Sequence, residues 1–172
     1  DPGCAFGTGT HQTTQLCMKA IEKYLKKGDK VADIGTGSGI LSICAIKFGA
    51  ASAYGCDIDD TVIDVCKENA KINGINVADY PQGEGSSAVT FELNTADKIT
   101  EKFDFVCANI LHNVLAEIMG DLKNIMKDDA IMSLSGILDE KKPVVLEAIE
   151  REGLKIIDTI SQDQWISFVV TK

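Results

Sequence analysis

Several residue types and patterns are scarce in this 172-residue chain, and each scarcity excludes a class of protein. Only two histidines are present, His11 and His112, and the six cysteines form no CxxC pair, so we expect no metal site. No apolar run approaches the roughly 18–20 residues of a membrane span, and no basic region followed by an apolar stretch marks a signal peptide. We therefore expect a cytoplasmic protein that contacts no membrane, with its cysteines buried as small hydrophobic side chains.

Basic residues are also fewer than acidic ones. The formal net charge is −9, whereas hydrophobic residues make up 45% of the chain and charged residues 25%. This mixture is typical of a soluble globular protein, and the length suits one domain with a sizeable core. A strongly acidic chain is a poor platform for a phosphate backbone, so we expect no direct nucleic-acid binding.

The segments that are present alternate between strand-like and helix-like patterns. Helices are expected at 13–26, 40–48, about 60–73, 113–127 and 139–152. Strands are expected at 31–34, 53–56, 89–93, 103–108, 131–135, 154–160 and 165–171, with a polar loop at 75–88. This order predicts an α/β fold: a mostly parallel seven-stranded sheet with helices on both faces and a C-terminal antiparallel hairpin. Ligands bind such sheets at the carboxyl ends of the strands.

A glycine-rich loop follows the first expected strand. Gly35, Gly37 and Gly39 occur at a spacing that does not match the GxGxxG fingerprint of NAD-binding proteins, because neither register has the third glycine. The spacing acid-x-Gly-x-Gly-x-Gly, beginning at Asp33, instead resembles the first motif of class I S-adenosylmethionine-dependent methyltransferases. Asp57 ends the second strand, where a carboxylate can accept both ribose hydroxyls. Taken alone, an acidic residue such as Asp57 more often caps a helix or is solvated.

Two further polar residues lie at strand positions that suggest a site. Asp33 is set in an apolar strand, where an unpaired charge is costly. It is expected to accept hydrogen bonds from loop amides or, through water, from the cofactor's ammonium group, and a purely structural role is an equal alternative. Asn109 ends the fourth strand, where related amine and amide methyltransferases carry Asn-Pro-Pro-aromatic. Here Ile110 and Leu111 replace the two prolines.

Five segments in order, DPGCAFGTGTHQTTQLC, ADIGTGSGILSI, DIDD, ANIL and LSGIL, resemble the catalytic domain of the PrmA family. The resemblance covers nearly all of residues 1–172, so we expect a Rossmann-like class I methyltransferase domain. It implies S-adenosyl-L-methionine as cofactor, S-adenosyl-L-homocysteine as product, and amino groups of a large-subunit ribosomal protein as substrate. Family members carry an N-terminal substrate-recognition domain, and we expect this chain to begin after it.

The resemblance also implies roles for individual residues. Thr14, Gly35, Asp57 and Asn109 correspond to cofactor-binding positions, and the segment from Phe6 to His11 matches a lid over the methionine end of the cofactor. The expected cofactor-contacting residues are Phe6, Gly7, Thr8, Gly9, Thr14, Asp33, Gly35, Gly37, Gly39, Asp57, Ile58 and Asn109. The expected catalytic groups are the Asn109 side-chain oxygen and the Ile110 carbonyl, which would accept N–H groups of the substrate amine.

Alternatives remain open at this point. His112 could relay a proton or be a surface residue, and Asn109 could be a strand-end turn residue. The protein could methylate another amine or small molecule, or be a cofactor-binding module without independent activity. The glycine spacing makes a NAD-dependent oxidoreductase the weakest of these alternatives.

Overall fold

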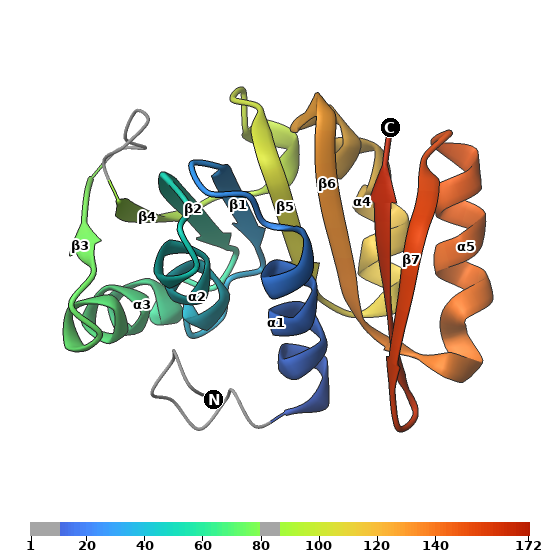
Figure 1. Ribbon diagram of the computed structural model, residues 1–172, viewed down its shortest axis with the longest axis horizontal. Coiled ribbons are helices and arrows are strands. Elements are labelled where there is room, and N and C mark those ends of the chain that lie inside the picture. Colours follow the sequence, from blue (N-terminus) through green and yellow to red (C-terminus); the bar gives the residue numbers. More distant parts are fainter. Residues whose placement is uncertain (1–10, 80–86) are drawn as a thin grey trace.

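The computed structural model describes residues 11–79 and 87–172. In this part of the chain, eight strands form one sheet flanked by helices (Figure 1). The first half contains α1 (Gln12–Tyr24), β1 (Lys30–Ile34), α2 (Ile40–Lys47), β2 (Ser52–Asp57), α3 (Thr61–Ile72), β3 (Asn76–Val77) and β4 (Ala88–Leu93). The second half contains η2 (Ala96–Lys98), β5 (Phe103–Asn109), α4 (His112–Asn124), β6 (Met126–Leu138), η3 (Asp139–Lys141), α5 (Lys142–Arg151), β7 (Lys155–Gln162) and β8 (Trp165–Thr171).

The strand order is β3-β4-β2-β1-β5-β6-β8-β7. Strands β3 to β6 pair in parallel, whereas β8 is antiparallel to both of its neighbours, β6 and β7. The chain moves from β1 outward to β2 and β4, then returns to the other side of β1 as β5. The sheet therefore reverses its winding direction between β1 and β5, and ligands of doubly wound sheets bind at such a point.

The two faces of the sheet carry separate hydrophobic cores. Successive residues of a strand point to opposite faces, so β5 sends Phe105 and Cys107 to the core under α1, α2 and α3, and Val106 and Ala108 to the core under α4 and α5. Figure 1 shows α1, α2 and α3 in front of the sheet and α4 behind it. Asp33 alternates with Ala32 and Ile34 and thus faces the α1 and α2 side.

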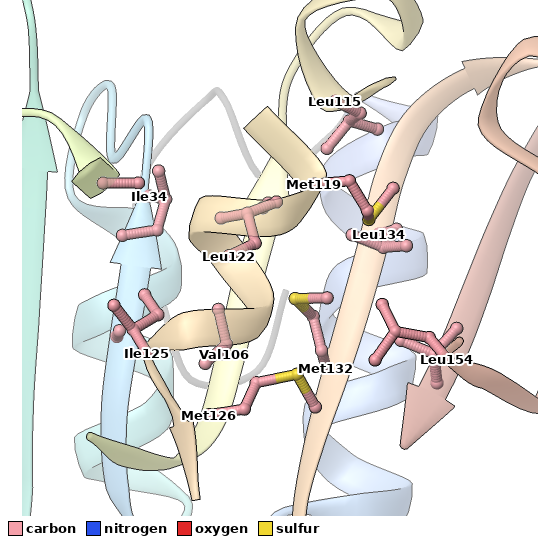
Figure 2. Packing of buried hydrophobic residues seen from close by; sticks show 14 of the residues in the cluster. Ile34, Val106, Leu115, Met119, Leu122, Ile125, Met126, Met132, Leu134 and Leu154 are labelled. Atoms are coloured by element: carbon pink, nitrogen blue, oxygen red, sulfur yellow. The ribbon is translucent and has the colours of Figure 1, made fainter. Parts of the chain in front are cut away.

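Helix α4 fills the middle of the second core. Leu115, Met119 and Leu122 are fully buried at spacings of three and four residues, the period of one helix face. Figure 2 shows Met119 next to Leu134 of β6, and all three side chains belong to the cluster that also contains Met132 and Leu134. This packing holds the start of α4, and the residues that precede it, against the sheet edge.

The predicted fold class is confirmed, with one correction to the strand count. The expected sheet had seven strands and the described sheet has eight, because Asn76 and Val77 pair with Ala88 and Val89 at the outer edge. These two residues were expected in the 75–88 loop, since a two-residue strand leaves no hydrophobic alternation to detect. No helix in residues 11–79 and 87–172 has the length and apolar character needed to cross a membrane.

Candidate active site

The glycine-rich loop connects β1 to α2 and has a backbone that favours glycine at all three positions. Gly35, Gly37 and Gly39 have φ angles of 72°, 58° and 84°, a region that side-chain-bearing residues rarely adopt. A Cβ on Gly35 would lie 2.5 Å from Ile110 Cγ2. The glycines thus allow both the turn itself and its close approach to the residues after β5.

Contacts from β2 and α3 fix this loop in place. The Gly35 and Thr36 amides both donate to the Cys56 carbonyl at 2.9 Å. Asp57 Oδ2 accepts the Gly37 amide at 3.0 Å, and the other carboxylate oxygen accepts the Asp59 amide at 3.1 Å. From α3, Asn69 Nδ2 donates to the Ser38 carbonyl at 2.9 Å. The glycine loop is therefore held in shape by hydrogen bonds to its neighbours, including one to Asp57 at the end of β2.

Asp33 lies beneath the loop, with only 1% of its surface exposed. Its Oδ2 accepts hydrogen bonds from the hydroxyls of Thr36 and Ser42, each at 2.8 Å. Burial raises the pKa of this carboxyl group, and the hydrogen bonds from Thr36 and Ser42 oppose that rise. The observed donors are mainly hydroxyls, where loop amides had been expected, and they tie the end of β1 to the start of α2.

A cavity of about 480 Å³ opens beside the loop at the carboxyl ends of the strands, a size suited to a small-molecule ligand. Its lining includes four predicted site residues: Gly35, Asp57, Ile58 and Ile110. The remaining lining residues are Ile34, Cys56, Asn94, Thr95, Ala96, Asp97, Leu111, Val114, Ile118 and Asp121. Aliphatic side chains dominate the walls, so the cavity suits a flat, largely apolar group with a few polar edges.

The segment after β4 is a part of the site that the sequence analysis missed. Asn94, Thr95, Ala96 and Asp97 all line the cavity, and Thr95 Oγ1 is a buried polar atom without a hydrogen-bond partner in the described part of the chain. A buried hydroxyl without a partner is costly, so a ligand atom that bonded to it would be stabilised. The rule that ligands bind at strand carboxyl ends, applied to β4, could have indicated this segment.

Asn109 is the last residue of β5 and does not line the cavity, whereas Ile110, which follows it, does. Asn109 pairs with Ser135 of β6, and the Ile110 amide donates to the Ser135 carbonyl at 3.3 Å. The Cα of Gly136 approaches both residues closely, because a Cβ there would lie 2.6 Å from Ile110 O and 3.1 Å from Asn109 Oδ1. Two acceptor oxygens, one side-chain and one backbone, therefore lie side by side.

The other predicted residues lie around this centre. Thr14 is buried in the first turn of α1, and His11 caps that helix by accepting the Thr13 amide at 3.2 Å. The His11 ring also meets Trp165 edge-on, with centroids 5.5 Å apart. His112 is the first residue of α4. Phe6, Gly7, Thr8 and Gly9 lie outside the described residues.

The cysteines near the site have the character of inert thiols. Burial raises the pKa of Cys17, Cys56 and Cys66 to about 12, so these groups stay protonated and are poor nucleophiles. Across residues 11–79 and 87–172, no group of three or more His, Cys, Asp and Glu side chains is arranged to hold a metal ion.

Comparison with known proteins identifies the relatives of this chain. The family model described as ribosomal protein L11 methyltransferase (PrmA) matches residues 1–172. The ribosomal protein L11 methyltransferases of Caldicellulosiruptor bescii and Bacillus subtilis are 40% and 39% identical over 172 residues, which is 100% of this chain and 53% and 52% of those proteins. The chain thus spans about half the length of the curated relatives it matches.

A solved structure agrees with the sequence comparisons. The ribosomal protein L11 methylase of Lactobacillus delbrueckii subsp. bulgaricus superimposes with a TM-score of 0.85 at 33% identity, covering 95% of this chain and 80% of that one. The similarity includes both the fold and a third of the residues.

Proposed function

The chain belongs to the PrmA family of ribosomal protein L11 methyltransferases, and we propose that residues 1–172 form a domain that binds S-adenosylmethionine and methylates amino groups of ribosomal protein L11. The observation that carries the proposal is the cavity beside the anchored glycine loop, which Asp57 and Ile110 line, with the Asn109 side-chain oxygen close to the Ile110 carbonyl. A cofactor and a substrate amine would meet there. Lysine side chains and the N-terminal amine are the amino groups proposed.

The residues present fit this cofactor. Each Asp57 oxygen accepts one amide and keeps a free lone pair, because a carboxylate has about four acceptor positions; these would take the ribose hydroxyls. The aliphatic walls, including Ile58 and Leu111, would sandwich the adenine base, and Thr95 Oγ1 would gain its missing partner at the base edge. By the family resemblance, Thr14 would contact the methionine end.

The proposed chemistry depends mainly on alignment. When bound, S-adenosylmethionine would supply a methyl group attached to a positively charged sulfur. Once the methyl group is transferred, this sulfur becomes part of a neutral thioether. Asn109 Oδ1 and the Ile110 carbonyl would accept two N–H groups of the substrate amine and direct its lone pair into the cavity. Because a lysine amine has a pKa of about 10.4, its neutral form must be favoured. The aliphatic walls favour it by desolvation.

Isothermal titration and a transfer assay test the proposal together. We expect the full chain to bind S-adenosylhomocysteine with micromolar affinity and to transfer tritiated methyl groups to purified L11. Asn109→Ala should lower the turnover number by about 100-fold, the cost of lost orientation, while changing the S-adenosylhomocysteine affinity much less. Asn124→Ala, at the exposed far end of α4, is the matched control and should behave as the unmodified chain.

The possible outcomes separate the alternatives. Equal losses of transfer and affinity in Asn109→Ala would show that Asn109 mainly holds the cofactor. Binding without transfer to L11 would point to another amine substrate or to a cofactor-binding module that needs a partner. No binding by folded protein would overturn the proposal.

A further inference from the structure

Strand β6 is irregular next to the acceptor oxygens of Asn109 and Ile110. The pairing of β6 with β8 shifts register between Leu134 and Ile137, and Gly136 within this interval has a φ of 86°. In Figure 1, β6 runs directly beside β5. This β-bulge bends β6 at the level of Asn109, the last residue of β5. Bulges redirect the groups beside them and are common near active sites.

The bulge touches both acceptor atoms. A Cβ on Gly136 would lie 2.6 Å from Ile110 O, 3.1 Å from the Ile110 carbonyl carbon and 3.1 Å from Asn109 Oδ1. The first distance is shorter than any ordinary contact between carbon and oxygen, and the atom it meets belongs to backbone. A rotamer change of a neighbouring side chain cannot relieve this clash, so the Ile110–Leu111 peptide would have to move.

Two buried serines hold the bulge. The hydroxyls of Ser135 and Ser167 lie 2.7 Å apart, and Ser167 Oγ also donates to the Leu134 carbonyl at 3.1 Å. Both serines are fully buried. Because the Ser135 carbonyl in turn accepts the Ile110 amide, the contacts run without a gap from β8 through the bulge to the acceptors.

We propose that Gly136 is a positioning residue: its missing side chain lets the serine-held bulge fix the Ile110 carbonyl and the Asn109 side chain at the spacing that the substrate amine requires. This inference rests on the proposed function and deepens it. Gly136 does not line the cavity. Because the clash falls on the acceptor atoms, its influence should fall mainly on the transfer of the methyl group, with a smaller effect on cofactor affinity through Ile110, which lines the cavity.

The test compares two glycine substitutions with the same backbone cost. Gly28 has a φ of 88°, and nothing lies within 4 Å of a Cβ placed there, so Gly28→Ala carries the left-handed backbone strain without a clash. Gly136→Ala carries the same strain and adds the collision with the acceptors. We expect Gly136→Ala to lower the turnover number with L11 about 100-fold, as expected for an approximately 1 Å misplacement. Its S-adenosylhomocysteine affinity should stay within about threefold of the Gly28→Ala value.

Each result of this test either supports or overturns the inference about Gly136. Equal turnover in the two variants, or a matching loss of cofactor affinity in Gly136→Ala, would overturn the inference while the unmodified chain still supported the proposed function. If the unmodified chain transfers no methyl groups, the proposed function fails and the inference fails with it. Should Gly136→Ala not fold, Ser167→Ala takes its place. That variant loosens the bulge without a clash, and unchanged turnover in it would overturn the inference, whereas reduced turnover at unchanged affinity would support it.

Discussion

At the scale of single residues, Asp33 and Asp57 show how one loop uses two carboxylates differently. Asp57 lies at the cavity, with an amide bonded to each oxygen. Asp33 is enclosed, and its bonds go to Thr36 and Ser42 within the loop and the following helix. The half-buried carboxylate of Asp57 lines the cavity, whereas the buried one of Asp33 shapes the turn. Asp33 thus supports the site from beneath, in agreement with the structural alternative for this residue.

The buried position of Asp33 predicts a dependence of stability on pH. Burial raises its pKa in the folded protein, so the folded state keeps this proton at pH values where the unfolded chain, with a pKa near 3.9, has lost it. Stability therefore falls as pH rises above about 4, until the folded pKa is passed. Asp33→Asn does not titrate and keeps an acceptor oxygen for both hydroxyls. Its melting temperature should rise relative to the unmodified chain between about pH 4 and pH 8.

Thermal melts across this pH range check the prediction. Asp128→Asn is the control, because Asp128 is fully exposed to water and its 3.9 Å ion pair with Lys172 contributes little, so the variant mainly reports the loss of one negative charge. If the difference in melting temperature between Asp33→Asn and the unmodified chain stayed constant or shrank as pH rose, the titration of Asp33 would not be its cause.

At the scale of elements, the segment between β4 and η2 is positioned by a polar group beneath it. Tyr54 of β2 donates its hydroxyl to Glu92 of β4 at 2.8 Å, and Asn94 Nδ2 donates to that hydroxyl at 3.0 Å. The backbone amide of Asn94 also donates a hydrogen bond to the Asp57 carbonyl at 3.1 Å. These contacts connect the ends of β2 and β4 and determine where Thr95 meets the cavity.

Removal of the Tyr54 hydroxyl should therefore weaken cofactor binding from outside the cavity. Tyr54→Phe loses hydrogen bonds worth about 1 kcal/mol each, and we expect S-adenosylhomocysteine to bind about fivefold more weakly in calorimetry. Tyr24→Phe is the matched control, because its hydroxyl bonds Asp158 between α1 and β7, remote from the cavity. Equal affinity in the two variants would show that the Tyr54 network does not position the segment.

The elements also show what could be predicted from sequence. Repeated alternation and the glycines at 35, 37 and 39 predicted the parallel sheet, its hairpin and the loop at β1, because these signals are local. Asn94–Asp97 and the Gly136 bulge could not be found in this way. Asn94–Asp97 carries no local motif, and Gly136 lies in the LSGIL segment but nothing in that segment shows a bulge. Each matters because the sheet order brings it beside a residue distant in sequence. Asn76–Val77 was missed because a strand so short takes its structure from its neighbour β4.

At the scale of the whole molecule, the cavity lies between segments from both halves of the chain. Its lining comes from β1, β2 and the segment after β4, and from the segment after β5 and α4. The two hydrophobic cores share the central strands β1 and β5. A ligand in the cavity thus contacts residues supported by both cores, and we expect it to stabilise the protein as one cooperative unit.

This arrangement predicts the size of the thermal shift. A ligand at 100 times its Kd adds about 2.7 kcal/mol to the free energy of unfolding, and each kcal/mol raises the melting temperature of a domain of this length by roughly 2–4 °C. S-adenosylhomocysteine at that concentration should therefore shift a single unfolding transition by about 5–10 °C. Asp57→Asn replaces one carboxylate oxygen with an NH2 group. This group cannot accept a hydrogen bond from the backbone amide of Gly37 or Asp59. A loss of about 1.5–3 kcal/mol of binding energy should reduce the shift at the same concentration to half or less.

Scanning calorimetry with the paired variant Asp60→Asn completes the test, because Asp60 carries the same charge near the start of α3 but makes no capping hydrogen bond. Its shift should match that of the unmodified chain. Two separated transitions, of which only one moved with ligand, would mean that the cores unfold independently and that the cavity belongs to one of them. A full shift in Asp57→Asn would remove this carboxylate from the ligand's contacts and leave Thr95 and the aliphatic walls as the binding surface.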